Sequence, residues 1–303
     1  RIEHDSSGES VDAAVYATPS GDTYRQGADA FVLACGAVET PRLLLLSESP
    51  QYPDGLANSS GAVGRYFMDQ PIVSVTGELE QPANQEPIGY HTRESHQFYD
   101  HDDPQPGSIK LVFENVNPES VVRPMLSGGD LTPRENVFDF AMGDSWGDEV
   151  LEKIESNYPN NSVRLLANPE LLPRRENRVT LDESKTDDFG NPVPDVSWNI
   201  GSHARETMEF IREIQYDIFD ELGATVVSET DLADPPPASH KMGTTRMGTD
   251  PEESVVTPRL RTHDLENLYI ASSSVFVTGG AMNPTLTIAA LALKAGEHID
   301  NAL

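Results

Sequence analysis

Residues 283–294 (NPTLTIAALALK) are the feature that most limits how this chain can fold. Asn is a favoured residue just before the first turn of a helix, and Pro at the next position loses no backbone hydrogen bond. Asn283 and Pro284 therefore predict a helix start. The residues that follow are apolar on almost every side, which predicts a buried helix. Because Gly279 and Gly280 precede it, we expect an open N-terminus of positive potential, suited to an anionic or electron-rich group.

A second segment, residues 239–248 (SHKMGTTRMG), contains His240. Further blocks accompany these two, namely FVLACGAVETPRLLLLS at 31–47, GRYFMDQP at 64–71, NRVTL at 177–181, SVVTP at 254–258 and NLYIASSSVF at 267–276. In this order the blocks resemble the C-terminal part of the glucose-methanol-choline (GMC) oxidoreductases. GTTRMG followed by NPTLTI most resembles the branch that contains the flavoprotein subunits of sugar and gluconate dehydrogenases. Several blocks in matching order are a much stronger signal than any single one.

The resemblance implies an α/β fold, in which a partial, Rossmann-like FAD-binding domain is interrupted by an α+β substrate domain with an antiparallel sheet. We expect the FAD-binding domain at residues 1–70 and 234–303, and the substrate domain at residues 71–233. Three consecutive prolines at 235–237 predict a stiff connector that returns the chain to the first domain.

The family begins with a strand, a G-x-G-x-x-G turn and a helix, whose glycines let the backbone approach the FAD pyrophosphate. This sequence contains no such motif, and it starts at Arg1 rather than at Met. We therefore expect the C-terminal half of a longer flavoprotein, either cut off or encoded separately. The missing N-terminal half is then an expected partner.

The local patterns predict the elements of both domains. Residues 11–34 predict a strand, a turn and a second strand, after which Thr40 and Pro41 predict the start of a helix. Apolar residues spaced by three and four predict a further helix at 201–223. Short β-rich runs predict an antiparallel sheet with one covered face. These runs lie at residues 72–79, 108–113, 162–166, 178–181 and 195–200.

Oxidation of an alcohol removes a hydroxyl proton and a hydride, so a flavin that accepts the hydride needs a neighbouring base. Histidine suits this task because its unperturbed pKa lies near about 6.5. The resemblance implies that His240 is this base and that Asn283 hydrogen-bonds the substrate oxygen. On sequence alone a core histidine is the commoner interpretation, and only the matching blocks around His240 reverse it. The family more often has His where this sequence has Gln70. The resemblance implies no catalytic role for this position.

The strand, glycine turn and helix around residues 31–46 form a unit that presents a nucleotide at the carboxyl end of the strand. By resemblance this turn touches the adenosine part of FAD, although Gly36 also fits a simple packing point between strand and helix. The strand that ends at residue 271 is implied to approach the pyrophosphate and ribityl chain. The predicted cofactor-binding residues are Cys35, Gly36, Ala271, Ser272, Asn283, Pro284 and Thr285.

The sequence carries 21 Lys and Arg against 50 Asp and Glu, a formal net charge of −29. Such a charge argues against nucleic acid and anionic lipid as partners, because both repel it. No apolar stretch approaches the length of a transmembrane segment. The acidic residues are dispersed, as on proteins from a very salty cytoplasm, where the Debye length falls to about 3 Å at 1 M. We expect a cytoplasmic protein of a high-salt cell.

The single cysteine, Cys35, can form no internal disulfide, and its apolar neighbours predict that it is buried. One cluster of His and Asp is spaced too irregularly for a metal site, so a solvated acidic loop is the better interpretation. The cluster comprises His91, His96, Asp100, His101, Asp102 and Asp103.

The leading hypothesis is a FAD-dependent oxidoreductase of CH–OH donors such as alcohols, sugars or polyols, a dehydrogenase rather than an oxidase. An electron-acceptor subunit is a further expected partner. The alternative is an inactive or binding-only half-protein that needs a separate N-terminal FAD-binding half. The presence of both His240 and Asn283 favours an intact site.

Overall fold

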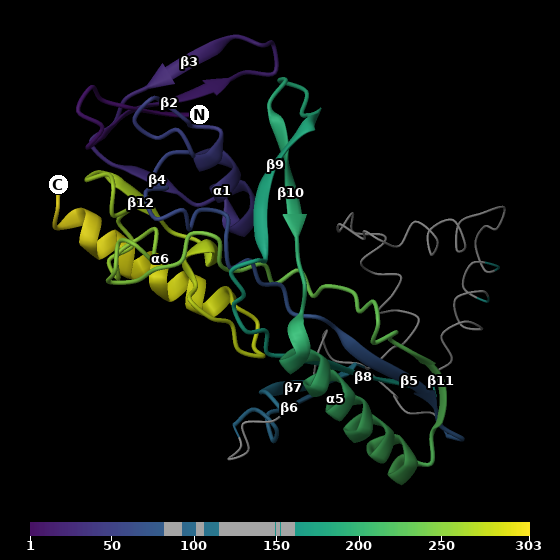
Figure 1. Cartoon of the computed structure of the whole chain (residues 1–303). Coiled ribbons are helices and arrows are strands. Elements are labelled where there is room, and N and C mark those ends of the chain that lie inside the picture. Colours follow the sequence, from purple (N-terminus) through teal and green to yellow (C-terminus); the bar gives the residue numbers. More distant parts are fainter. Residues whose placement is uncertain (82–92, 101–105, 115–148, 150–151, 153–160) are drawn as a thin grey trace. The chain divides into compact units, whose positions relative to one another are not determined.

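The computed structural model describes residues 1–81, 93–100, 106–114, 149, 152 and 161–303 (Figure 1). The chain forms two compact units. Unit 1 comprises Arg1–Gln70, Glu170–Gly201 and Pro237–Leu303, and unit 2 comprises Pro71–Pro169 and Ser202–Pro236. The chain therefore leaves unit 1 and returns to it twice.

Unit 1 contains three small sheets and two α-helices within the described residues. Its helices are α1 (Gly36–Leu45) and α6 (Thr285–Asp300), and a short 3-10 helix, η1 (Ser273–Val275), follows the last strand. The sheets are the antiparallel β1 (Ile2–His4), β2 (Val11–Ala17) and β3 (Thr23–Gln26), the parallel pair β4 (Phe31–Leu33) and β12 (Leu268–Ile270), and the antiparallel hairpin β9 (Arg178–Thr186) and β10 (Pro192–Ser197).

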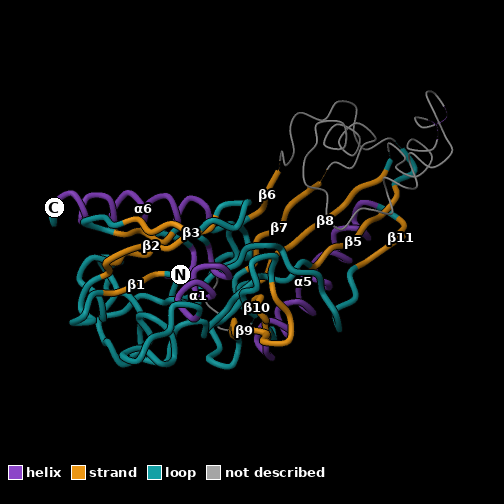
Figure 2. The backbone as a smooth tube through the Cα atoms, turned by 90° about the horizontal axis from the view of Figure 1, so that it is seen from above, coloured by secondary structure: helices purple, strands orange, loops and turns teal. Residues whose placement is uncertain are grey.

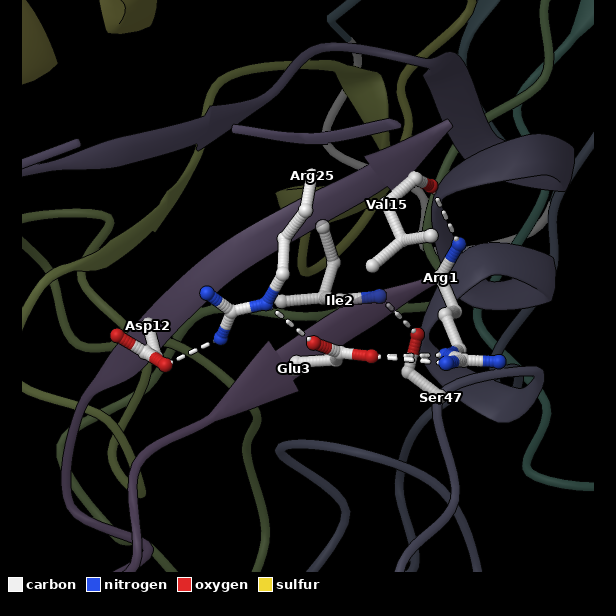
Figure 3. Close-up of polar contacts among 7 residues, drawn as sticks. All are labelled: Arg1, Ile2, Glu3, Asp12, Val15, Arg25 and Ser47. Carbon is white, nitrogen blue, oxygen red and sulfur yellow. Dashed lines mark hydrogen bonds and ion pairs between the residues drawn. The ribbon is translucent and has the colours of Figure 1, made fainter. Parts of the chain in front are cut away.

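The first sheet is joined to the end of α1 by a buried hydrogen bond (Figure 3). Ile2 N donates to Ser47 Oγ at 2.8 Å. Because β1 is an edge strand of the described sheet, this bond satisfies a backbone N–H that β2 does not pair with. On the solvent side Arg25 bridges Glu3, at 2.8 Å, and Asp12. Solvent screens exposed ion pairs of this kind, so the buried hydrogen bond contributes more to holding the sheet against α1.

Within the described residues, unit 2 is an antiparallel sheet of five strands covered on one face by α5 (Gly201–Leu222). Gln215 on α5 donates to the carbonyls of Val73 and Leu165 at 3.1 and 3.0 Å, which fixes the helix to the central strands. Figure 2 shows the strands side by side in the order β11 (Thr225–Glu229), β5 (Val73–Glu78), β8 (Ser162–Pro169), β7 (Ile109–Glu114) and β6 (Arg93–Ser95).

The predicted sheet with one covered face is confirmed for the runs at 72–79, 108–113 and 162–166, and the helix at 201–223 is confirmed as well. The runs at 178–181 and 195–200 are also strands, but assigning them to the same sheet was wrong. They form the β9–β10 hairpin, which belongs to unit 1.

The hairpin lies in unit 1 because α1 and its neighbours bind it at several points. Arg42 on α1 donates to Asp187 at 2.8 Å and to the carbonyl of Pro192 at 2.9 Å. Val179 N donates to the carbonyl of Gly64 at 2.8 Å. The two units therefore differ from the predicted domains at residues 170–201 and 234–236. The roles of the units as FAD-binding and substrate domains stay predictions.

Helix α1 begins at Gly36, earlier than the predicted start at Thr40 and Pro41, so that prediction was wrong. Proline inside a helix has no N–H to offer the carbonyl four residues before it, which here is that of Ala37. Thr244 supplies the missing donor, because its hydroxyl bonds the Ala37 carbonyl at 2.9 Å. A distant side chain thus allows α1 to run through Pro41.

Helix α6 is not buried in the described chain, contrary to the prediction. Leu286 and Leu293 are 83% and 74% exposed, and only Ala295 is buried. An apolar pattern reveals that a helix needs a covering surface, but it does not reveal which polypeptide provides that surface. The predicted Asn283 cap was also wrong, because Pro284 occupies the N-cap position, and its side chain makes no cap hydrogen bond.

Candidate active site

The backbone around His240 is held by two segments of unit 1 that run antiparallel, residues 66–70 and 238–244. Met68 and Met242 exchange backbone hydrogen bonds at 2.9 and 2.8 Å. Gly243 has φ +76°, and a Cβ at this position would lie 2.1 Å from Tyr66 O. Only glycine fits there, so the turn that follows His240 is fixed by a steric requirement.

Asp69 is a buried carboxyl, 2% exposed, behind the backbone of His240. Burial raises the pKa of Asp69 above its ordinary value, and this effect is opposed by Lys241 Nζ at 3.6 Å and by backbone N–H groups. The N–H of His240 donates to Asp69 Oδ1 at 2.8 Å. The carboxyl therefore anchors the main chain of His240.

The imidazole of His240 lies between two carboxamides. Its Nδ1 is 2.7 Å from Gln70 Oε1, and its Nε2 is 2.8 Å from Asn283 Nδ2. Gln70 is fully buried, whereas Asn283 is exposed and His240 is half-buried. The structure thus brings the predicted pair His240 and Asn283 together on a side that a small molecule can reach. Their action on a substrate stays a prediction.

The predicted cofactor-binding turns lie at one edge of the parallel pair β4–β12. Leu33 pairs with Ile270 at the carboxyl ends of the two strands, so both chains leave the sheet at the same edge. Ala271 N donates to Leu33 O at 2.9 Å. Gly36, at φ +75°, has open space where a Cβ would lie. The edge therefore combines open space at Gly36 with the N-terminus of α1.

The hydroxyl of Ser272 is used inside the protein, because it accepts a hydrogen bond from Ser274 N at 3.2 Å. Ser272 is also buried. Gly243 N donates to Ser273 O at 3.0 Å, and Thr245 N donates to Ser274 O at 2.9 Å. The segment after His240 consequently lies against η1, which follows the strand edge directly.

Of the remaining predicted residues, Pro284 is buried and Thr285 is the exposed first residue of α6. Cys35 is exposed, so the prediction of a buried cysteine was wrong. Strand β4 ends at Leu33, and Cys35 lies beyond its alternating buried pattern, at the N-cap of α1.

Only part of the acidic His and Asp cluster lies within the described residues. His96 is exposed and lies 3.3 Å from Glu94. Asp100 is exposed too. The interpretation as a solvated loop stays a prediction, because His91, His101, Asp102 and Asp103 lie outside the described residues.

Gln70 is a contact of the His240 ring that the sequence did not assign. The sequence singled it out only as a difference from the family, and it carries no local pattern of its own. An amide that follows a buried Asp gives no indication of what its side chain will meet.

A family model described as GMC oxidoreductase matches residues 173–292. The chain is 33% identical over 306 residues to 2-methyl-1,2-propanediol dehydrogenase of Mycolicibacterium austroafricanum, which covers 99% of this chain and 53% of the relative. The chain belongs to the GMC oxidoreductase family. A second GMC relative, the fructose dehydrogenase large subunit of Gluconobacter japonicus, is 31% identical over 97% of this chain and 51% of its own length. This GMC chain thus spans about half the length of these curated relatives.

Solved structures share the α/β fold of this GMC chain. A formate oxidase variant from Aspergillus oryzae, from work on FAD modification, matches with a TM-score of 0.69 at 16% identity, covering 100% of this chain and 59% of that one. Pyridoxine 4-oxidase from Mesorbium loti matches with a TM-score of 0.66 at 17% identity, covering 99% and 56%. Among the helices of the described residues, none has the length and apolar character needed to cross a membrane.

Proposed function

We propose that this chain provides the catalytic pair of a FAD-dependent oxidoreductase that acts on CH–OH donors, with His240 as the base. The observation that carries the proposal is the 2.8 Å contact between His240 Nε2 and Asn283 Nδ2. The two groups present a proton acceptor and a hydrogen-bond donor to the same point. A substrate hydroxyl that binds there finds the two groups that its deprotonation needs, a base for the proton and a hydrogen-bond donor for the oxygen.

FAD supplies a hydride acceptor when it is bound. His240 Nε2 takes the hydroxyl proton, and the Asn283 amide donates to the oxygen as negative charge develops on it. Asp69 holds the backbone of His240 through the bond from its N–H at 2.8 Å. The ring is therefore positioned before substrate arrives, so the reaction does not have to lose conformational entropy to fix the imidazole.

The residues at the β4–β12 edge fit FAD in their chemistry. Gly36 offers open space next to the N-terminus of α1, where backbone N–H groups favour phosphate. Cys35 is exposed beside it, and the backbone of Ala271 and Ser272 lies on the adjacent strand end. Asn283, Pro284 and Thr285 would complete the cradle at the start of α6.

We propose a sugar or polyol as the substrate and a dehydrogenase rather than an oxidase as the enzyme. The relatives at 33% and 31% identity are named for a diol and for fructose, and both are dehydrogenases. Paromamine 6'-oxidase from Streptomyces fradiae, an oxidase, is less similar, at 27%.

We further propose that FAD binds only when an N-terminal half carrying the G-x-G-x-x-G turn is also present. The chain spans about half of its relatives, and its sequence lacks that turn. The exposed leucines of α6 would pack against this half. The relative named as a large subunit supports an electron-acceptor subunit as a second partner. The charge of −29 supports a high-salt cytoplasm as its location.

The test is anaerobic reduction of the bound flavin in the complete protein, with a panel of sugars, diols and simple alcohols. The proposal expects rapid bleaching with a sugar or polyol, followed by faster reoxidation with a dye acceptor than with O₂. A flavin that binds but is reduced by none of them would support the binding-only alternative. Faster reoxidation by O₂ would overturn the dehydrogenase assignment alone.

A further inference from the structure

The buried amide of Gln70 has an orientation that its surroundings determine. Its Nε2 donates to the carbonyl of Gly280 and lies 3.4 Å from that of Met282. Gln70 has no exposed surface, so no bulk water can replace these partners. Turning the amide over would place its oxygen against two carbonyl oxygens and leave a buried N–H group without an acceptor, which costs about 1–3 kcal/mol. The amide oxygen must therefore face His240.

The orientation of Gln70 in turn determines which ring nitrogen of His240 carries the proton. Gln70 Oε1 lies 2.7 Å from His240 Nδ1 and can only accept a hydrogen bond. In a neutral imidazole one nitrogen donates and the other accepts. Nδ1 therefore carries the hydrogen, and Nε2 is the basic nitrogen.

Asn283 is consistent with this assignment from the other side of the ring. Its Nδ2 lies 2.8 Å from His240 Nε2, and an amide N–H can bond only a nitrogen that is unprotonated. The carbonyls that orient Gln70 belong to Gly280 and Met282, immediately before Asn283 in the sequence. One short segment thus orients both carboxamides.

We propose that Gln70 is a positioning residue that locks His240 in the Nδ1–H tautomer and so directs its basic nitrogen, Nε2, toward Asn283 and the substrate. The importance of this tautomer for catalysis rests on the proposed function, whereas the tautomer itself follows from the contacts alone. Without Gln70 the ring can place its proton on Nε2, and a molecule in that form cannot accept the hydroxyl proton there.

The direct test reads the tautomer by NMR in the complete protein with ¹⁵N-labelled histidine side chains, since the two tautomers give distinct nitrogen shifts and long-range couplings. His240→Gln assigns the signal. We expect Nδ1–H in the wild type. Gln70→Met has a similar length and only a weakly accepting sulfur in place of the amide, and we expect it to move His240 substantially into the Nε2–H form. Asn283→Ala is the matched control, because it removes the amide at the opposite ring nitrogen and should leave Nδ1–H in place.

A wild-type ring in the Nε2–H form, or a folded Gln70→Met protein that keeps Nδ1–H, would overturn the proposal. If Gln70→Met does not fold, Gln70→Asn, whose shorter amide withdraws from the ring, replaces it in the same comparison. The rate of flavin reduction should fall by at least the factor by which the Nδ1–H population falls, with little change in substrate binding. The NMR measurement needs neither substrate nor turnover, so it tests this inference separately from the proposed function. If the wild-type ring is in the Nδ1–H form but flavin reduction does not depend on His240, the proposed function is disproved and this inference stands.

Discussion

Asn283 Nδ2 lies 2.8 Å from His240 Nε2, although 43 residues separate the two in the sequence. Pro284 takes the N-cap position of α6, and its side chain makes no cap hydrogen bond. Asn283 lies just before the helix and meets the imidazole through its Nδ2.

Asn283→Ala should slow flavin reduction strongly without loosening the fold. Removal of one preorganised donor to a developing oxyanion costs about 10²–10³ in rate. A lost helix cap would instead lower the free energy of unfolding by about 0.5–2 kcal/mol. Single-turnover reduction and chemical denaturation of the same protein separate the two roles. A large loss of stability with an unchanged rate would show that Asn283 serves the helix.

Thr244→Val should destabilise the protein because it removes the hydroxyl that bonds the Ala37 carbonyl at 2.9 Å. Thr244 is fully buried, so the carbonyl is left without a donor at a cost of about 1–3 kcal/mol. Pro41→Ala restores an N–H at the position that proline vacates. The double variant should consequently lose less than the sum of the two single variants.

A denaturation series on wild type, Thr244→Val, Pro41→Ala and the double variant measures this coupling. Thr245→Val is the matched control, because Thr245 bonds Ser274 Oγ at 2.7 Å and not α1. Additive losses in Thr244→Val and Pro41→Ala would refute the link between them.

Asp187 should contribute stability that acid removes. Its pKa is lowered from 3.8 to about 2, chiefly by the N–H of Asn191 and also by Arg42. A group whose folded pKa is lowered stabilises the fold above its unfolded pKa, and this contribution disappears as the pH falls through the folded value. Asp187→Asn should thus be less stable than wild type at pH 5, with a difference that shrinks between pH 3.8 and about 2.

Thermal melts across this range check the prediction, with Asp188→Asn as a control that removes the same charge at the neighbouring position. A constant difference between Asp187→Asn and wild type down to pH 2 would argue that the carboxylate has no special partners.

Stability should rise with salt. The formal charge of −29 makes the folded chain repel itself, and added ions screen that repulsion. We expect the melting temperature to increase steadily from dilute buffer to multimolar KCl. An unchanged melting temperature would contradict the assignment to a high-salt cell.

The sequence predicted what depends on local patterning and missed what depends on distant partners. The helix α5 and the strands β5, β7 and β8 follow from hydrophobic periodicity, which acts within each element. The start of α1 does not, because Thr244 lies 207 residues from the carbonyl that it satisfies. The position of the β9–β10 hairpin depends similarly on Arg42, which pairs with Asp187 across 145 residues.

The sequence predicted residues of the site only where several motifs follow the same order as in the GMC family. That order located His240 and Asn283, whose contact the structure contains. Gln70 could not be found in this way, because its role depends on the carbonyls of Gly280 and Met282, and backbone carbonyls leave no trace in a sequence.

The most direct test of the account is the rate at which substrate reduces the flavin in His240→Ala. Replacing a general base should slow this step by about 10²–10⁴ while the flavin stays bound with its normal absorbance. A His240→Ala protein that binds flavin and is reduced at the wild-type rate would contradict the assignment of His240 as the base.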